Sequence, residues 1–307
     1  MDLALVECFL RVAEFGSINR AAEDLEMTQP ALSRRLDSLE HDLGVTLLIR
    51  GARGVTLTEA GTTLVQGAAP ILRQAALLRE SIGKRAQTQV AVGLPFSMHR
   101  LITSSFAARE IRVQKTVSLR IYEGFIHHLR DWMLQGLIDV AIMDSRDINP
   151  EAVDHTPLIR EQILLVGPRS AALRMDRKVD ARFVGGCPLI LPGRPNYIRQ
   201  SVQAYLKSAG EKFHRAADAE TLPLCLTLTK EGLGYTAMPY CAIHENPVMS
   251  ELSAAPVDGL YVTWSINVSR ARRHSVSVRQ TAAKLRAMMV ELVRSGNWPL
   301  AELVAQA

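Results

Sequence analysis

Residues 28–35 bring together side chains that could form hydrogen bonds with DNA. Gln can pair bidentately with adenine, Arg with guanine, and Ser with base edges or phosphate. Two further arginines flank a glycine-containing turn and could reach phosphates or the minor groove; the alternative is that they are solvated turn residues. The candidate DNA-binding residues are Thr28, Gln29, Pro30, Ser33, Arg34, Arg35, Arg50 and Arg53.

The leucines around these residues predict the helix that presents them. Thr28 can cap this helix, and Pro30 suits its first turn, where a missing N–H does no harm. The helical period leaves Gln29, Ser33 and Arg34 outside or beside the apolar stripe. That stripe has spacings of four, three and four and consists of Leu32, Leu36, Leu39 and Leu43.

Two shorter patterns precede this helix. Ser17 is a predicted cap, and Ala21 and Ala22 face inward, where small residues let helices approach closely. Residues 3–15 have amphipathic spacing and end at Gly16. The segment 17–43 therefore indicates a helix-turn-helix, and an ordinary amphipathic helical hairpin is the alternative.

The run from Leu3 to Gly61 resembles the LysR-type bacterial transcriptional regulators. The segments that carry the resemblance are TQPALSRRLDSLEHDLG at 28–44 and RGARGVTLTEAG at 50–61. One departure is Leu48, where the family usually has an aromatic residue, and we expect it to change only local packing. The resemblance implies binding to double-stranded promoter DNA, dimers that pair into tetramers, a small-molecule effector, and RNA polymerase as a further partner.

The segment after the predicted recognition helix indicates a wing and a linker. VTLLIRGARGVTLT at 45–58 contains two β-prone runs about a turn, which predicts a hairpin. From Thr58, a predicted cap, a helix should run to about Lys84, with an interior Pro70 that predicts a bend. Its apolar residues repeat with a mean period typical of a coiled-coil dimer seam, namely Leu64, Ala68, Ile71, Ala75, Leu78 and Ile82.

Beyond residue 88 the pattern changes to strands that alternate with helices. Residues 89–144 fit a βαβαβ unit, which predicts a mainly parallel sheet with right-handed crossovers. A second set of strands and helices occupies 161–239, and a strand at 260–268 precedes a helix at 276–294. LIDVAIM at 137–143 and EGLGYTAMP at 231–239 resemble the LysR effector domain, whose fold is similar to that of periplasmic solute-binding proteins.

The predicted fold class is therefore an N-terminal all-α winged helix-turn-helix plus a long linker helix, followed by a C-terminal α/β effector domain of two Rossmann-like subdomains. We expect the DNA-binding domain at 1–58, the linker and dimerisation helix at 59–88, and the effector domain at 89–307. Subdomain I should comprise about 89–160 and 266–307, and subdomain II about 161–265.

Ligands in open α/β sheets bind beyond the carboxyl ends of strands, which points to the residues that follow each predicted strand. Helices that start near Phe125 and Thr221 would aim their positive ends at a ligand, and Arg194 could add charge, so we expect an organic acid. Phe125 and Tyr197 suggest an aromatic one. The candidate effector-binding residues are Ser97, Met98, Gly124, Phe125, Asp144, Arg194, Asn196 and Thr221.

Each of these assignments has a plainer alternative. Ser97 and Thr221 match positions where LysR relatives present a hydroxyl to the effector, but both could simply cap helices. Arg194 lies in a GRPN loop and could be a solvated turn residue. His127 and His128 have no third ligand nearby in sequence, so we expect a helix surface and no metal site.

Composition bounds the remaining function classes. The chain has 307 residues, 48% of them hydrophobic, no signal segment and no long apolar run, which favours a cytoplasmic protein without a membrane partner. Its net charge is +5, but residues 1–88 hold 10 Lys and Arg against 11 Asp and Glu, whereas the remainder holds 26 against 20. The excess of positive charge therefore lies outside the predicted DNA-binding domain.

The cysteines and the missing catalytic motifs define the alternative functions. Cys8, Cys187, Cys225 and Cys241 show no CxxC spacing, which fits a reducing compartment. The last three could make a thiol-based redox-sensing regulator, although buried cysteines are more often structural. We find no nucleophile elbow, phosphate loop or metal-ligand cluster, so we expect no enzyme, catalytic residue or cofactor. A solute-binding protein is opposed by the helix-turn-helix.

Overall fold

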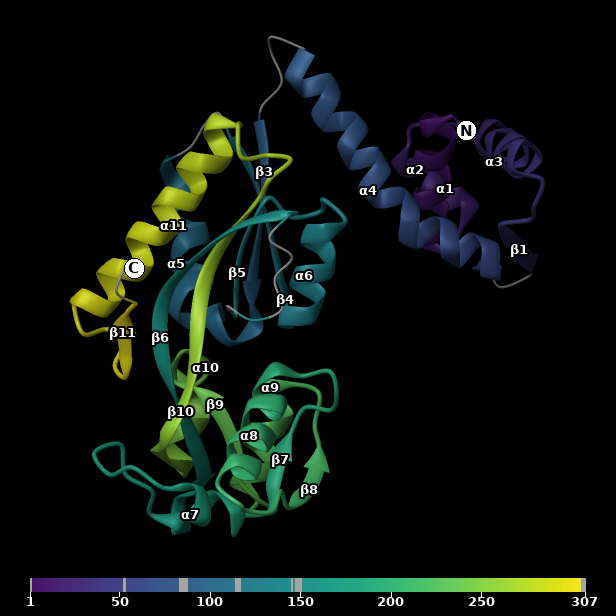
Figure 1. Cartoon of the computed structure of the whole chain (residues 1–307). Helices are drawn as coiled ribbons and strands as arrows, with labels where there is room; N and C mark the ends of the chain where they lie inside the picture. Colours follow the sequence, from purple (N-terminus) through teal and green to yellow (C-terminus); the bar gives the residue numbers. More distant parts are fainter. Residues whose placement is uncertain are drawn as a thin grey trace. The chain divides into compact units, whose positions relative to one another are not determined.

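The computed structural model describes residues 2–51, 54–82, 88–113, 117–144, 146 and 151–304. The chain divides into two compact units, Met1–Ala86 and Gln87–Ala307. The first unit is mainly helical, and the second is a mixed α/β structure (Figure 1). Among the described residues, no helix is both long and apolar enough to cross a membrane.

The N-terminal unit is built on three helices whose ends follow from their sequence. Gly16 and Gly44 end two of the helices with positive φ values of 59° and 69°, which glycine adopts at little cost. The Ser17 hydroxyl accepts a hydrogen bond from the Arg20 N–H and caps the middle helix, as predicted. The helices are α1 (Leu3–Phe15), α2 (Ile18–Asp24) and α3 (Gln29–Leu43).

The leucine stripe of α3 forms the centre of this unit. Leu32, Leu36 and Leu39 are fully buried against Phe9 and Val12 of α1. Leu43, the last residue of the predicted stripe, is only partly buried. Burial of the stripe leaves the opposite face of α3 available for contacts outside the unit.

The predicted wing is an antiparallel hairpin of β1 (Leu48–Gly51) and β2 (Gly54–Leu57). Gly54 adopts φ +118° and approaches α1 so closely that an added Cβ would lie 2.5 Å from the Gly16 carbonyl oxygen. Leu48, the departure from the family pattern, is buried in the core of the unit.

The linker helix α4 (Glu59–Ile82) begins after Thr58, whose hydroxyl accepts a hydrogen bond from the Gly61 N–H. The first part of its predicted dimer seam has a partner within the chain itself. Leu64 and Ala68 pack into the core of the DNA-binding unit, whereas the Ile71 side chain is 46% exposed. The side chains of Pro70, Leu78 and Ile82 lie outside the described residues, so the bend and the rest of the seam stay predictions.

The second unit begins with the predicted βαβαβ arrangement. Its three strands have the order β5-β3-β4, and β3 is parallel to both neighbours. Between β3 and α5 the chain forms two short irregular helices, of which η1 was not predicted and η2 overlaps the start of the helix predicted from about Arg100 to Arg109. The elements are β3 (Thr88–Pro95), η1 (Phe96–Met98), η2 (His99–Thr103), α5 (Ser104–Val113), β4 (Val117–Gly124), α6 (Ile126–Leu134) and β5 (Val140–Asp144).

Two long antiparallel strands, β6 (Val153–Pro168) and β10 (Leu252–Ser269), run through both halves of this unit (Figure 1). Each begins eight residues earlier than the sequence pattern predicted. Because β10 is antiparallel to β5, and β6 to β9 (Thr236–Pro239), the complete sheet is mixed rather than mainly parallel. The closing elements on the first half are α11 (Val276–Arg294) and β11 (Ala301–Leu303), which pairs with β6.

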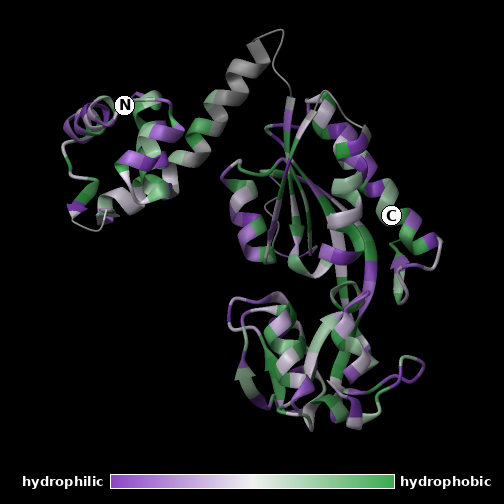
Figure 2. Ribbon diagram, turned by 180° about the vertical axis from the view of Figure 1, so that it is seen from behind, coloured by the Kyte–Doolittle hydropathy of each residue, from purple (hydrophilic) through white to green (hydrophobic). Residues whose placement is uncertain are grey.

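The second half, which follows β6, has its own small sheet. Strand β7 is parallel to β8 and is bridged to Tyr235, and β9 continues from there to pair with β6. Hydrophobic residues concentrate along the strands of the unit (Figure 2). The elements are η3 (Arg169–Ala171), α7 (Ala181–Gly185), β7 (Leu189–Leu191), α8 (Tyr197–Ser208), β8 (Arg215–Asp218), α9 (Leu222–Lys230), β9 (Thr236–Pro239), α10 (Tyr240–Ile243) and η4 (Pro247–Glu251).

Candidate DNA-reading helix and effector pocket

The N-terminal end of α3 presents the polar residues that its sequence predicted. Gln29 and Arg34 are exposed and Ser33 is half-buried on the flank. The Gln29 side-chain amide donates a hydrogen bond to the Ser33 hydroxyl at 3.1 Å. Thr28 occupies the N-cap position, but its side chain makes no capping hydrogen bond, and Pro30 lies in the first turn. This end of α3 can therefore offer amide, hydroxyl and guanidinium groups to a partner.

The other candidate arginines have partners inside the unit. Arg35 directs one guanidinium nitrogen to the Cys8 sulfur at 3.5 Å, which ties α3 to α1. Arg50 of β1 forms an ion pair with Asp37 of α3, with 2.5 Å between Nη2 and Oδ1. Arg53 lies outside the described residues. Arg34 is exposed and has no ion-pair partner within the described part of the chain, so its whole guanidinium group is free to contact DNA, whereas that of Arg35 is partly engaged by Cys8.

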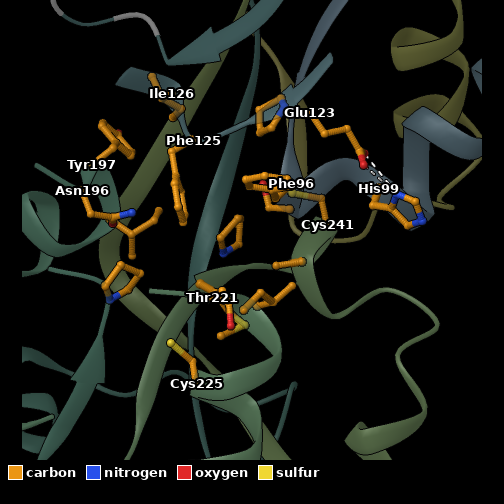
Figure 3. A pocket seen from close by; sticks show the side chains of 18 of the residues that line it. Phe96, His99, Glu123, Phe125, Ile126, Asn196, Tyr197, Thr221, Cys225 and Cys241 are labelled. Atoms are coloured by element: carbon orange, nitrogen blue, oxygen red, sulfur yellow. Dashed lines mark hydrogen bonds and ion pairs between the residues drawn. The ribbon is translucent and has the colours of Figure 1, made fainter. Parts of the chain in front are cut away.

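A cavity of about 580 Å³ lies between the two halves of the α/β unit (Figure 3). It is formed where β3 and β4 end, where α6, α8 and α9 begin, and beside β9 and α10. Five of the eight candidate effector residues line it, namely Ser97, Gly124, Phe125, Asn196 and Thr221.

Three helices begin at this cavity. The Asn196 side chain caps α8, and the Thr221 hydroxyl caps α9, so the plainer alternative for Thr221 is correct in this respect. Helix α6 differs, because Phe125 at its N-cap position provides no side-chain hydrogen bond. Phe125, Ile126 and His127 all line the cavity, so the uncapped first turn of α6 faces it. Helix N-termini carry partial positive charge and favour anions.

The walls of the cavity are mainly aromatic and apolar, although Arg100 and the paired His99 and Glu123 side chains also line it. Phe96 and Phe125 meet edge to face with 5.4 Å between ring centroids, and Tyr197 also lines the cavity (Figure 3). Trp264 belongs to the lining as well. His127 stacks on Phe125 with an interplanar angle of 8°. Burial and the neighbouring His128 lower the pKa of His127, which keeps its ring neutral near pH 7. The cavity thus suits a ligand with an apolar or aromatic body.

Two family models match this chain, one over the DNA-binding unit and one over most of the α/β unit. The family model of the bacterial regulatory helix-turn-helix proteins of the lysR family matches residues 3–62. The model of the LysR substrate binding domain matches residues 83–290. The chain belongs to the LysR family of bacterial transcriptional regulators.

Individual relatives of this LysR-family chain match it over nearly its whole length. The transcriptional regulator BbuR of Bordetella bronchiseptica is 26% identical, with 97% of this chain and 93% of the relative covered. The nitrogen assimilation regulatory protein nac of Klebsiella aerogenes is 29% identical, with 92% and 93% covered. The structure of full-length CbnR with its target DNA has a TM-score of 0.70 at 21% identity, covers 94% of this chain and 99% of CbnR, and so supports the fold.

Three of the predicted effector residues of this LysR-family chain do not line the cavity. Met98 is fully buried in the core next to η2, because the turn of η1 directs Ser97 and Met98 to different sides. Arg194 lies outside the lining, and its guanidinium approaches the Gln203 side chain at 3.4 Å. Asp144 is buried and accepts hydrogen bonds from Arg146.

Asp144 binds Arg146, a residue that the sequence did not indicate as functional. Arg146 forms an ion pair with Asp144 of β5, donates to Ser201 of α8 at 2.8 Å, and lies 4.1 Å from the centroid of Tyr197. Burial and the nearby Asp144 carboxylate raise the pKa of the Tyr197 hydroxyl, so it stays protonated. Arg146 therefore joins the two halves of the unit beside the cavity, a role that depends on residues far apart in sequence.

A buried carboxyl group lies behind the cavity floor and was also missed. Glu161 of β6 is fully buried and accepts hydrogen bonds from the Trp264 indole N–H at 2.5 Å and the Cys241 backbone N–H at 2.9 Å. Trp264 and Cys241 themselves line the cavity. Burial raises the pKa of Glu161 despite these hydrogen bonds. No sequence pattern distinguishes this residue from an exposed strand glutamate.

The four cysteines are buried and form no disulfide. Burial raises the pKa of Cys187 and of Cys225 to about 11, and that of Cys241 well above its usual value. Since the thiolate is the reactive form, these environments do not favour the redox-sensing alternative. Within the described part of the chain, no group of three or more His, Cys, Asp or Glu side chains could hold a metal ion.

Proposed function

We propose that this LysR-family chain reads promoter DNA with the exposed start of α3 and that a small organic anion with an apolar or aromatic body, bound in the cavity of the α/β unit, modulates this binding. Gln29, Ser33 and Arg34 contact the DNA, and Thr28 and Pro30 lie against the DNA backbone. The same protein acts in the cytoplasm, as a dimer through α4, and not as an enzyme.

The uncapped first turn of α6 is the observation that carries the effector assignment. Its Phe125 N-cap offers no hydrogen-bond acceptor, so the amides of the first turn lack the side-chain partner that α8 and α9 have. These amides belong to residues that line an otherwise largely apolar cavity. A carboxylate would satisfy them, and the partial positive charge at the helix end would stabilise it. Asn196 and Thr221 stand at the neighbouring helix starts.

The modulation follows from where the cavity lies. It is bounded by both halves of the unit, and Arg146 joins these halves beside it. A ligand that binds one relative position of the halves more tightly shifts the population toward it. A coupling of about 1–3 kcal/mol between effector and DNA is typical of such systems. The domain limits that we propose are 1–58 for DNA binding, 59–88 for the linker and 89–307 for the effector domain.

The effector assignment is tested by thermal unfolding of the full chain in the presence of benzoate, phenylacetate or hexanoate, each compared with its neutral carboxamide. We expect at least one carboxylate to raise the melting temperature and its carboxamide to have no such effect. Phe125→Asp places a fixed carboxylate at the N-cap of α6 and should abolish the shift. Phe96→Asp makes the same side-chain change on η1, beside Phe125 but not at the N-cap position of α6, and should weaken the shift without abolishing it.

The outcomes separate the charge requirement from the shape requirement. Equal shifts with a carboxylate and its amide would mean that the cavity binds apolar bodies and that α6 plays no part in anion recognition. If Phe125→Asp and Phe96→Asp reduce the shift in melting temperature equally, the ligand is held by aromatic contact alone and not by the N-terminus of α6. Absence of any shift with all three acids would oppose the proposed ligand class.

A further inference from the structure

A second groove, here called the α11 groove, lies on the first half of the α/β unit, away from the effector cavity. Its volume is about 450 Å³. Arg279, Ala282, Ala283 and Arg286 of α11 form one wall at helical spacings of three, one and three. The other wall and floor come from one face of two paired strands, namely Asp154, Thr156 and Leu158 of β6 and Ile266 and Val268 of β10.

The groove combines an apolar floor with a cationic rim. Leu158 and Ile266 are buried beneath it, and the two alanines between the arginines leave the space open. Arg273 and His274, in the turn before α11, extend the rim. Asp154 is the one acid of the lining, and it already lies 2.8 Å from Arg270 and 3.9 Å from Arg273.

The charge of this region accounts for the imbalance seen in the sequence. Residues 270–294 contain seven Lys and Arg and a single acid, Glu291, an excess of six. The whole of residues 89–307 has the same excess, 26 against 20, so the positive charge of the protein is concentrated on this segment. Arg272 and Lys284 form ion pairs with Asp139 and Glu110, whereas Arg286 has no ion-pair partner among the described residues.

We propose that the α11 groove is a docking site for an extended acidic segment of a partner protein, in which an apolar side chain fills the floor and a carboxylate on either side meets Arg279 and Arg286. The apolar floor favours a peptide over duplex DNA, which presents phosphates and no apolar side chain. The α carbons of Arg279 and Arg286 lie about 10 Å apart along the helix. In an extended peptide, acids at positions one and five share a face with position three and are about 13 Å apart, a difference that flexible side chains span.

The adjacent strand edge supports an extended partner. Strand β11 pairs with β6 at Ile159–Glu161, and β9 pairs with it at Ile163–Val166. Among the described residues, no strand pairs with the outer edge of β6 at 153–157, the segment that contributes to the groove. Such an edge offers backbone hydrogen bonds to an extended chain.

The test measures fluorescence anisotropy of a labelled peptide, Gly-Ser-Glu-Ser-Leu-Ser-Glu-Ser-Gly, with the full chain. The peptide with both Glu changed to Gln carries the same label and serves as the charge control. We expect the acidic peptide to bind at least about tenfold more tightly than its control. Arg286→Gln should weaken binding by about fivefold, as expected for one exposed ion pair. Ala283→Leu, which fills the groove at an exposed position, should weaken it by more than about tenfold.

Arg294→Gln is the matched control, since it makes the same charge change on α11 outside the groove lining and should leave binding unchanged. Equal binding of the acidic and Gln peptides, or equal effects of Arg286→Gln and Arg294→Gln, would overturn the proposal. It would also be overturned if 4-phenylbutanoate displaced the peptide at an equal or lower concentration, which would indicate a small-carboxylate site. Random duplex DNA that binds more tightly than the peptide and loses affinity in Arg286→Gln would assign the groove to nucleic acid.

Discussion

The start of α3 carries its exposed polar residues within two turns of one helix, whereas the effector cavity takes its lining from the ends of two strands, the starts of three helices and the segments around β9 and α10. In α3, one leucine stripe decides which residues face outward. In the cavity, no single period decides this, because each segment contributes only a few residues. Function held on one helix can thus be predicted locally, and function held between segments depends on the tertiary arrangement.

The largest effect should come from removing the support of α3. Leu32 is fully buried in the core of the DNA-binding unit. Leu32→Ala should lower the free energy of unfolding of this unit by about 2–5 kcal/mol, because it loses apolar burial and leaves a cavity. Urea denaturation followed by circular dichroism measures the change. Leu43→Ala, at the partly buried end of the same stripe, is the matched control and should cost less. Equal losses in both variants would contradict the assigned stripe.

The next largest effect should come from the exposed face of α3, opposite its leucine stripe. Arg34→Ala should weaken binding to the DNA upstream of the gene by about 1–3 kcal/mol and reduce sequence selectivity, as expected for a base-reading arginine. Fluorescence anisotropy across a salt series measures both quantities. Arg11→Ala removes an exposed arginine from α1 and should have little effect on DNA affinity. A similar loss in both variants would indicate a general charge effect in place of base reading.

The sequence could predict those cavity residues whose positions depend on local pattern. Three residues that follow a strand or cap a helix do line the cavity, namely Phe125, Asn196 and Thr221, whereas Asp144 at the end of β5 is buried outside it. Met98 follows the same strand as Ser97, but the unpredicted turn of η1 buries it in the core. The lengths of β6 and β10 were underestimated because their first halves contain strand-breaking residues, Pro157 in β6 and Pro256 with Gly259 in β10. The main strands and helices depend on local pattern, and so they were predicted.

Residues that act through distant partners could not be predicted. Arg146 gains its role from Ser201 and Tyr197, which lie more than fifty residues further along the chain. Glu161 depends on Trp264 and Cys241 in the same way. The wing arginine Arg50 was predicted to contact DNA, and its pairing with Asp37 became evident only when the hairpin was placed beside α3. That contact with DNA stays a prediction.

A smaller effect, confined to the α/β unit, should depend on pH. Burial raises the pKa of Glu161 above its ordinary value of 4.5, so the folded state binds its proton more tightly than the unfolded state does. The stability that Glu161 contributes is therefore complete below about pH 4.5 and is lost as the pH rises through the folded-state pKa. Glu161→Gln mimics the protonated form and should gain melting temperature relative to the wild type as the pH rises.

The measurement is a series of thermal unfolding curves from pH 4 to pH 9 for both proteins. Glu302→Gln, on the exposed part of β11, is the control and should show no such trend. If the difference in melting temperature between Glu161→Gln and the wild type stays constant over this range, the pKa of Glu161 is the same in the folded and unfolded states. The DNA-binding unit lacks Glu161, so its own transition should not follow this trend.

The smallest effect tests whether the wing contacts DNA together with α3 or only supports α3 from within the protein. The Arg50 and Asp37 side chains are 45% and 60% exposed, so their ion pair should contribute at most about 1 kcal/mol to stability. If Arg50 leaves this pair to neutralise a phosphate, Arg50→Ala should lower the slope of log affinity against log salt by about one. Asp37→Asn is the matched variant, since it releases Arg50 and removes a negative charge from α3, and it should raise DNA affinity. An unchanged salt slope in Arg50→Ala would restrict the DNA contact to α3 and leave the Arg50–Asp37 pair as a link between the wing and the helix.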